Sequence, residues 1–348
     1  MNQFSRNTRV RRMNATAMPM IKRAFALTML SLLAACGGGG GGSSGSSVSP
    51  PTYTGDNLAV FTQLNAVRQS AGAGTTAQNA ALDTAAASHA SYLVNNSLVT
   101  NAAYLNSVVG GILGGHYEDT SIPGYVGGFT GCTPQARATA AGYSGTVNEL
   151  LSFGATTAAD CTASIENSVY HLVQLIAPFT EIGLSFNAGS GSGPVCAIEL
   201  GVGSTAQLPA IGSWVSYPAN GQINVAPAFY NQAESPVPAA DLSSAGHPVA
   251  ISLYNQSNSS LLVGNIVLHT FTLTALSSPV SARVLAQPGV GSDGTALTPD
   301  ANIPAPGILV LLPTTPLSPN TVYSVAFSAT ANGAAVSKNW SFTTGNMN

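Results

Sequence analysis

Charge is the scarcest property of this chain. Only 7% of its 348 residues are charged, against roughly 25% in a typical soluble domain. Six of the ten basic residues lie before position 24, and only Arg68, Arg137, Arg283 and Lys338 follow. Four basic residues against all 13 acidic residues give this part of the chain a net charge of −9. Such a chain lacks the basic surface that binding to nucleic acid or to an anionic membrane surface requires.

Cysteines, long apolar runs and catalytic motifs are scarce as well. The four cysteines form no CxxC pair and no Cys/His spacing typical of a zinc site. The apolar run of residues 24–35 is too short to span a bilayer. No HExxH or SxxK motif occurs, and the single GxSxG match, at residues 41–45, lacks a strand–turn–helix context. The sequence therefore marks no activated nucleophile.

Residues 1–36 are expected to be a lipoprotein signal peptide. Lys22 and Arg23 precede the apolar run, and the residues LAAC follow it at positions 33–36. This ending resembles a bacterial lipobox, in which the cysteine becomes lipidated after cleavage. Residues 37–53 are rich in Gly, Ser and Pro and are expected to form a flexible tether. We therefore expect an envelope protein that a lipid on Cys36 holds at a bacterial membrane (outer membrane or cell surface), with secretion as the alternative.

Export would allow disulfide formation. Cys132, Cys161 and Cys196 follow Cys36, so at most one intramolecular bridge can form and one thiol is left over. Cys132 and Cys161 lie in loop-like or helix-start sequence, whereas Cys196 lies in a strand-like run. We expect a bridge between Cys132 and Cys161.

Residues 54–208 predict a domain with its helices first and its strands late, which favours an α+β fold. Thr133 and Pro134 predict a helix start. "FTEIGLSF" and "GPVCAIELGVG" predict two strands bounded by glycines. Three helical faces are predicted from apolar residues at helical spacing: Leu58, Phe61, Leu64 and Val67; Leu82, Ala86, His89 and Leu93; and Ile165, Val169, Leu172 and Ile176.

A series of segments in this domain occurs in a characteristic order. They are "LNAVRQSAG", "LDTAAASHASYL", a Gly-rich loop with a histidine, "PGYVGGFTGCTPQARATAAGY", "VNEL" and "YHLVQLIAPFTEIGLSF". Together they resemble a bacterial CAP domain, of the superfamily of cysteine-rich secretory proteins, antigen 5 and plant pathogenesis-related proteins. The resemblance covers most of residues 54–208 and implies a CAP-type α-β-α sandwich.

The resemblance also implies a cleft with two histidines and two acidic residues. His116 stands at the first histidine position and His171 at the second. Glu149 stands at the Glu of a Gly-Glu-Asn motif, although the residues on both sides of it depart from that motif. Leu172 replaces the Arg that usually follows the second histidine.

The fourth member of the cleft is either Glu118 or Glu166. Two imidazoles with carboxylates suit a divalent metal, zinc above all, with His116 and His171 as its ligands. His116, Glu149, His171 and Glu118 would equally suit general acid–base catalysis.

Simpler interpretations of these residues stay open. His116 could be a solvated loop residue, and His171 a structural histidine. His89 lies on an apolar helix face and is expected in the core. Asp119 is expected at the surface, and Glu181 beside the sheet.

Residues 213–346 change in composition and predict an all-β domain. Short alternating runs such as "HPVAISLYN", "GILVLLP" and "TVYSVAFSAT" are separated by turn residues. "YPANGQINVAPAF" and the final "LPTTPLSPNTVYSVAFSATANGAAVSKNWSFTTG" resemble a bacterial Ig-like domain, a spacer or binding module. His247 and His269 are expected to be surface or strand residues, and Trp340 a core residue.

Three functions are compatible with these features. The first is a CAP-domain protein of undefined activity whose His/Glu cleft binds a divalent metal. The second is a non-enzymatic module that binds a lipid, glycan or peptide. The third is a hydrolase that uses metal- or base-activated water, because the sequence marks no nucleophile. The sequence does not decide whether the protein is an enzyme.

Overall fold

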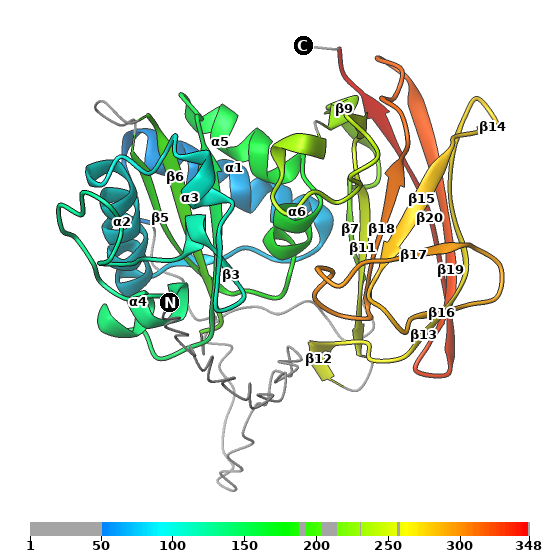
Figure 1. Ribbon diagram of the computed structural model, residues 1–348. Coiled ribbons are helices and arrows are strands. Elements are labelled where there is room, and N and C mark those ends of the chain that lie inside the picture. The colour runs from blue at the N-terminus through cyan, green and yellow to red at the C-terminus, as the bar shows by residue number, and fades with distance from the viewer. Residues whose placement is uncertain (1–50, 188–192, 204–213, 230, 256–257, 347–348) are drawn as a thin grey trace, which may run out of the picture. The chain divides into compact units, whose positions relative to one another are not determined.

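The structure, a computed structural model, describes residues 51–187, 193–203, 214–229, 231–255 and 258–346. The chain is a mixed α/β protein whose strands form several sheets (Figure 1). The predicted signal peptide, nearly all of the predicted tether and the predicted boundary at 208–213 lie outside the described residues. Within the described part of the chain, no helix has both the length and the apolar character needed to cross a membrane.

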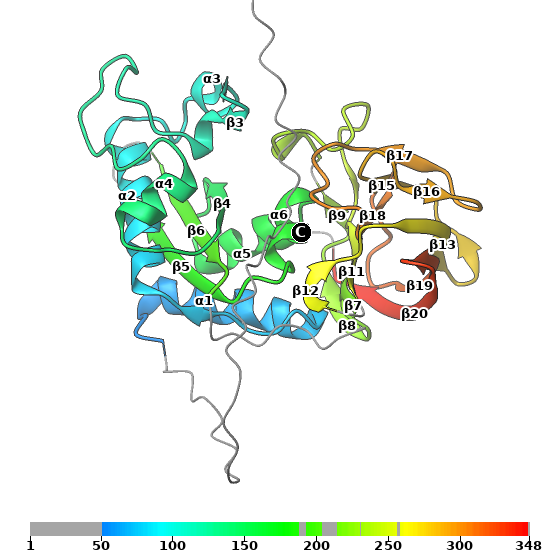
Figure 2. The ribbon, with the colours of Figure 1, turned by 90° about the horizontal axis from the view of Figure 1, so that it is seen from below.

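The first region, residues 55–203, is built on a four-stranded sheet with helices on both faces (Figure 2). The strand order is β1-β5-β6-β4, in which β4 and β5 are antiparallel to β6, and β1 is parallel to β5. The strands are β1 Ala77–Gln78, β4 Val147–Phe153, β5 Glu181–Asn187 and β6 Val195–Gly201, with a small hairpin of β2 Val108–Val109 and β3 Ile112–Leu113. The helices are α1 Gly55–Ala71, α2 Ala80–Asn95, α3 Ala102–Leu105, η1 Gly114–His116, α4 Pro134–Ala140, α5 Ala158–Glu166 and α6 Tyr170–Leu175.

Each face of this sheet is buried by a different set of helices. Ala86 and Leu93 of α2 pack with Ala197 of β6 on one face. Helices α1, α5 and α6 cover the other face, where they share a core with Ile198. Gly183 of β5 allows the close approach of α2, because a Cβ at this position would lie 2.0 Å from a backbone carbon of that helix.

The predicted helical faces are confirmed to different degrees. The four residues predicted on α2 are all buried. Thr133 caps α4 by accepting a hydrogen bond from the Ala136 amide, with Pro134 in the first turn, as predicted. On α1, Leu58 is exposed and Val60 takes the buried position instead.

The third predicted face is carried by two helices, because the chain breaks between α5 and α6. All four of its apolar residues are nevertheless fully buried. Residues from later in the chain form hydrogen bonds at this break. The Asn167 side chain donates to the Ala228 carbonyl at 2.9 Å, and the Glu234 carboxylate accepts from the Val169 and Tyr170 amides. Long-range hydrogen bonds thus replace the helical bonds that the break removes.

The second region contains two six-stranded sheets, and its predicted strands are confirmed. One sheet has the order β12-β11-β18-β15-β17, with β7 paired to β11; the other has the order β14-β13-β19-β20-β8, with β16 paired to β13. The strands of the first sheet are β7 Trp214–Tyr217, β11 Val249–Asn255, β12 Asn258–Leu262, β15 Ala282–Ala286, β17 Leu297–Pro299 and β18 Ile308–Pro313. Those of the second are β8 Gln222–Val225, β13 Ile266–Ala275, β14 Ser278–Pro279, β16 Gly291–Ser292, β19 Val322–Ala331 and β20 Ala334–Thr344. A short pair, β9 Ala228–Phe229 and β10 Ala245–Gly246, and the turn η2 Asn231–Ala233 complete the region.

The two regions share a hydrophobic core, and β18 shows how. Leu309 and Leu311 pack between the two sheets with Phe271 of β13. The alternate residues of β18, Val310 among them, pack with Ile165 and other residues of the helices of the first region. A strand that is buried on both faces is apolar throughout, which explains the continuous run "GILVLLP".

The disulfide connects Cys161 of α5 to Cys196 of β6, with the Cα atoms 6.1 Å apart. Cys132 is free and exposed. The predicted Cys132–Cys161 bridge is therefore wrong. Both bridged cysteines are buried in the core between α5 and the sheet. Successive side chains of β6 point to opposite faces of the sheet, and Cys196 is on the face that α5 covers.

Candidate functional site

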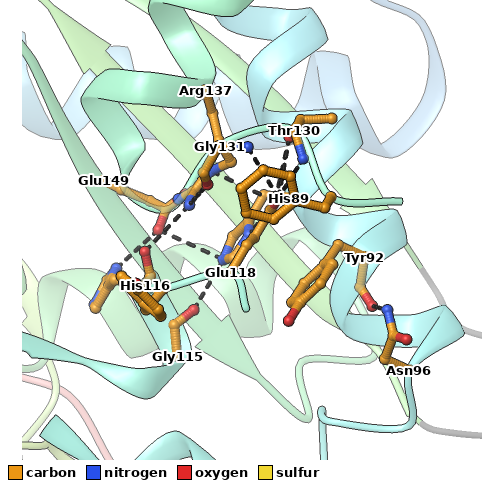
Figure 3. A network of polar contacts seen from close by, with 12 residues as sticks. His89, Tyr92, Asn96, Gly115, His116, Glu118, Thr130, Gly131, Arg137 and Glu149 are labelled. Atoms are coloured by element: carbon orange, nitrogen blue, oxygen red, sulfur yellow. Dashed lines mark hydrogen bonds and ion pairs between the residues drawn. The ribbon is translucent and has the colours of Figure 1, made fainter. Parts of the chain in front are cut away.

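Four ionisable side chains are buried together between α2, α4 and β4 (Figure 3). They are His89 of α2, Glu118 of the loop after η1, Arg137 of α4 and Glu149 of β4, and each is at most 3% exposed. In a chain with so few charges, this cluster concentrates much of the buried charge in one place.

Glu149 connects the cluster to His116. Its carboxylate accepts a hydrogen bond from Arg137 Nη2 at 2.6 Å and lies 2.9 Å from Nδ1 of His116. Burial alone would raise the pKa of Glu149, but Arg137, followed by His89 and His116, holds it well below its usual value. Glu149 is therefore ionised at neutral pH, so His116 presents its proton on Nδ1 and donates it to this carboxylate.

His89 and Glu118 form the second pair of the cluster. Nε2 of His89 lies 2.8 Å from the Gly115 carbonyl, which can only accept, so Nε2 carries a proton. Nδ1 lies 3.0 Å from Glu118, and one proton is shared across that contact. Glu118 also accepts from the backbone amides of Thr130 at 2.6 Å and Gly131 at 3.3 Å.

Glu199 of β6 adds a third buried carboxyl group next to Glu149. The two residues are directly opposite each other in the antiparallel pair of β4 and β6. Burial, followed by the charge of Glu149, raises the pKa of Glu199 well above its usual value, which favours its protonated form. Within the cluster, Arg137 pairs with Glu149 and His89 pairs with Glu118. Such pairing is what buried charges require.

The glycines before His116 place this side chain. The Gly114 amide donates to the Ser107 carbonyl at 2.7 Å. A Cβ at Gly114 would lie 1.9 Å from the Tyr104 carbonyl oxygen, so only glycine permits this close packing of η1 against α3. Arg137 Nη1 donates to the His116 carbonyl at 3.2 Å. The side chain of His116 is 23% exposed.

His116 and His171 line the same pocket, a cavity of about 780 Å³. The first region supplies most of the lining, and the second region supplies Phe229, Ala233, Glu234, Ser235 and Val237. The large apolar lining residues are Leu105, Leu113, Leu151, Phe153, Phe229 and Val237. The polar lining residues besides the histidines include Ser152, Ser164, Asn167, Ser168, Glu234 and Ser235.

Glu234 holds His171 in its place at the start of α6. Its carboxylate accepts from the amides of Val169 at 2.8 Å, Tyr170 at 2.7 Å and His171 at 3.3 Å. Nδ1 of His171 lies 3.8 Å from the same carboxylate. Burial, followed by the proximity of His116, lowers the pKa of His171 to about 4, so its imidazole is neutral at neutral pH. Burial raises the pKa of Glu234 to about 7, against the opposing effect of the backbone hydrogen bonds.

The predicted site residues occupy three different places. His116 contacts Glu149 directly, and His171 lines the same pocket as His116. Glu118 belongs to the buried cluster behind Glu149 and is 0% exposed. Glu166, the alternative to Glu118, instead accepts a hydrogen bond from the Tyr217 hydroxyl at 3.0 Å.

Four residues of the site were not predicted as members: His89, Arg137, Glu199 and Glu234. His89 is buried as expected, but both of its ring nitrogens lie in the polar cluster. Arg137 could have been noticed, because it is one of only four basic residues after position 24. Nothing in the local sequence distinguishes Glu199 or Glu234, whose partners depend on strand register and on contact between the two regions.

The residues that could hold a metal ion are His116 and His171. Among the described residues, no group of three or more His, Cys, Asp or Glu side chains is placed to hold an ion. The two imidazoles would thus supply a part of a coordination shell, and solvent or a ligand would complete it.

The arrangement gives the pocket one oriented imidazole. Because Nδ1 of His116 donates to Glu149, its Nε2 is left as a hydrogen-bond acceptor, a base or a metal ligand. In the described part of the chain, no serine hydroxyl or cysteine thiol is hydrogen-bonded to this ring; the Ser164 hydroxyl bonds to Ser152 at 2.6 Å and to the Cys161 carbonyl. No protein-family model matches this chain, and no curated protein matches its sequence.

Proposed function

We propose that this protein is an exported, CAP-like protein that binds a small organic ligand in the pocket lined by His116 and His171. The observation that carries the proposal is the pocket itself, about 780 Å³ in volume. Ligand sites in proteins occupy about 300–1,000 Å³ and combine an apolar lining with a few placed polar groups. The lining of this pocket has that composition.

The residues behind the pocket have a positioning role in this proposal. Arg137 keeps Glu149 ionised, and Glu149 fixes the tautomer and orientation of His116. Nε2 of His116 accepts a hydrogen bond from the ligand, while side chains such as Phe153 and Phe229 pack against its apolar part. The pocket is then ready to bind without rearrangement, which lowers the entropic cost of binding.

Histidine-labelled protein tests the proposal by NMR. Drug-sized fragments are titrated while the ring signals of His116 and His171 are followed. Ala233→Trp fills the pocket lining and should abolish the ligand-induced shifts. Ala240→Trp, the same change at an exposed residue outside the lining, should leave them intact. A library in which no fragment shifts either ring contradicts the proposal.

A divalent metal at His116 and His171 is a second candidate for the occupant of this pocket. It is favoured by the contact between Glu149 and Nδ1 of His116, because metal-binding histidines commonly donate their other ring proton to a carboxylate. Calorimetry with zinc should show binding to the wild type and none to the His116→Ala/His171→Ala variant. Equal binding by the two proteins contradicts a metal site.

We also propose that Cys36 is lipidated and that the protein remains at the cell envelope through this lipid. The proposal rests on the basic, apolar and LAAC segments before position 37. Cys36→Ser should move the protein from the membrane fraction to the soluble fraction and remove the mass of the lipid. Cys132→Ser, which replaces the free thiol, is the matched control and should remain in the membrane fraction. A Cys36→Ser protein that is still in the membrane fraction contradicts lipidation.

A further inference from the structure

The described residues that line the pocket include an acidic side chain but no Lys or Arg. Among the described residues that line it, the ionisable ones are His116, His171 and Glu234, and no Lys or Arg is among them. Arg137 lies behind Glu149 and is 1% exposed, so its charge is already compensated. The described lining therefore contains one carboxyl group, Glu234, beside two imidazoles and no Lys or Arg side chain.

The second region supplies this acidic group. Glu234 lies next to η2 and reaches α6, more than 60 positions earlier in the chain, through its three backbone hydrogen bonds. Those amides favour the ionised carboxylate, but burial raises the pKa of Glu234 to about 7, so the side chain is about half ionised at neutral pH and mostly ionised at pH 8. The acidic character of the pocket thus depends on contact between the two regions and would be missing from the first region alone.

Two polar side chains of the lining, His116 and Ser164, have their protons engaged within the protein. Nε2 of His116 is an acceptor, because Nδ1 donates to Glu149. The Ser164 hydroxyl proton is engaged within the protein, on Ser152 or the Cys161 carbonyl. A ligand that donates hydrogen bonds can pair with these two groups, whereas one that only accepts them leaves Nε2 of His116 unpaired.

Resting on the proposed pocket function, we infer that the ligand carries a cationic amine group on an apolar body. An ammonium group supplies a positive charge, which no Lys or Arg of the described lining provides, and an N–H donor for Nε2 of His116. A carboxylate or phosphate group would lie near Glu234 without a counter-charge, which is unfavourable in a partly buried site. The net charge of −9 on the chain after position 24 attracts a cationic ligand over a longer range as well.

Three probes with the same alkyl chain isolate the contribution of the head group: octylamine, octanol and octanoate. Calorimetry on the full chain measures each affinity at pH 8, where most Glu234 side chains are ionised, and NMR of the histidine rings localises each probe. Octylamine should bind about tenfold more tightly than octanoate or better, with octanol between them. Glu234→Gln should remove most of the preference for octylamine over octanol. Asp293→Asn removes one acidic charge from an exposed residue of the same region and should leave the preference unchanged.

The outcomes separate this inference from the proposed function. Octanoate binding as tightly as octylamine to the wild type, with shifts of His116 and His171, overturns the amine preference and leaves the pocket function standing. Failure of all three probes to shift either ring overturns both. Because the comparison of octylamine with octanoate uses the wild type alone, it remains decisive even where Glu234→Gln fails to fold.

Discussion

Replacing Arg137 by methionine is the sharpest test of the buried cluster. Methionine fills similar space but lacks the positively charged guanidinium group, which donates hydrogen bonds to Glu149 and to the His116 carbonyl. The variant leaves an ionised Glu149 without its strongest partner in a site that is at most 3% exposed. Removing one partner of a buried ion pair typically costs about 3–5 kcal/mol, because the other charge stays buried and uncompensated. We expect the free energy of unfolding to fall by about this amount.

The pH dependence of stability should change together with its magnitude. In the wild type the pKa of Glu149 is lower in the folded than in the unfolded state. Glu149 therefore adds stability above the ordinary pKa of a glutamate, about 4.3, and this contribution is lost as the pH falls below it. Without Arg137 the effect of burial dominates and Glu149 binds a proton more readily when folded. The penalty of the variant should therefore shrink as the pH falls toward 4.

Urea denaturation followed by far-UV circular dichroism measures these differences. Arg283→Met is the matched control, because Arg283 pairs at 2.8 Å with Asp241, which is 64% exposed. An ion pair near solvent contributes about 0–1 kcal/mol. Glu149→Gln combined with Arg137→Met should recover part of the loss, because the double variant leaves no unpaired charge. An Arg137→Met protein no less stable than Arg283→Met, at the same pH, would refute the reasoning.

Three further predictions concern the packing, the disulfide and the contact between the regions. Gly183→Ala should destabilise the protein by about 3 kcal/mol or more, because its Cβ would lie 2.0 Å from backbone, whereas Gly264→Ala, with nothing within 4 Å, should be nearly neutral in denaturation. Reducing the Cys161–Cys196 bridge, which closes a loop with a sequence separation of 35, should lower the free energy of unfolding by about 4 kcal/mol; an unchanged urea midpoint would contradict this. Burial lowers the pKa of His247 to about 3, so stability should decline by up to ~4 kcal/mol as the pH falls from about 6.5 toward 3. His247→Gln should lose this decline, and a retained slope would assign it to other groups.

The secondary structure was predicted from local patterns of apolar residues in the sequence. Leu82, Ala86, His89 and Leu93 are all buried on α2 because helical periodicity determines which side chains share a face. The strands β5, β6, β11 and β18–β20 follow from apolar runs bounded by turn residues. These features depend on residues close together in the chain, so a short stretch of sequence contains the information that determines them.

The break between α5 and α6 is a feature that the local sequence pattern does not predict. Apolar spacing continues through residues 165–176, and all four predicted residues are buried. The helix nevertheless stops, and Asn167 and the amides of Val169 and Tyr170 are hydrogen-bonded to Ala228 and Glu234 instead. A spacing argument cannot include partners that lie more than 60 positions away.

The sequence by itself determined that His116, Glu149 and His171 were candidates for one site, through the order of segments that resemble a CAP domain. Tertiary structure alone decided that Glu118 and not Glu166 joins the cluster, that Arg137 and His89 complete it, and that Glu234 enters the pocket. It also decided that Cys161 pairs with Cys196. The physical reason is common to these cases: a buried charge or thiol is stable only next to a specific partner, and strand register and packing of distant segments determine which partner lies there.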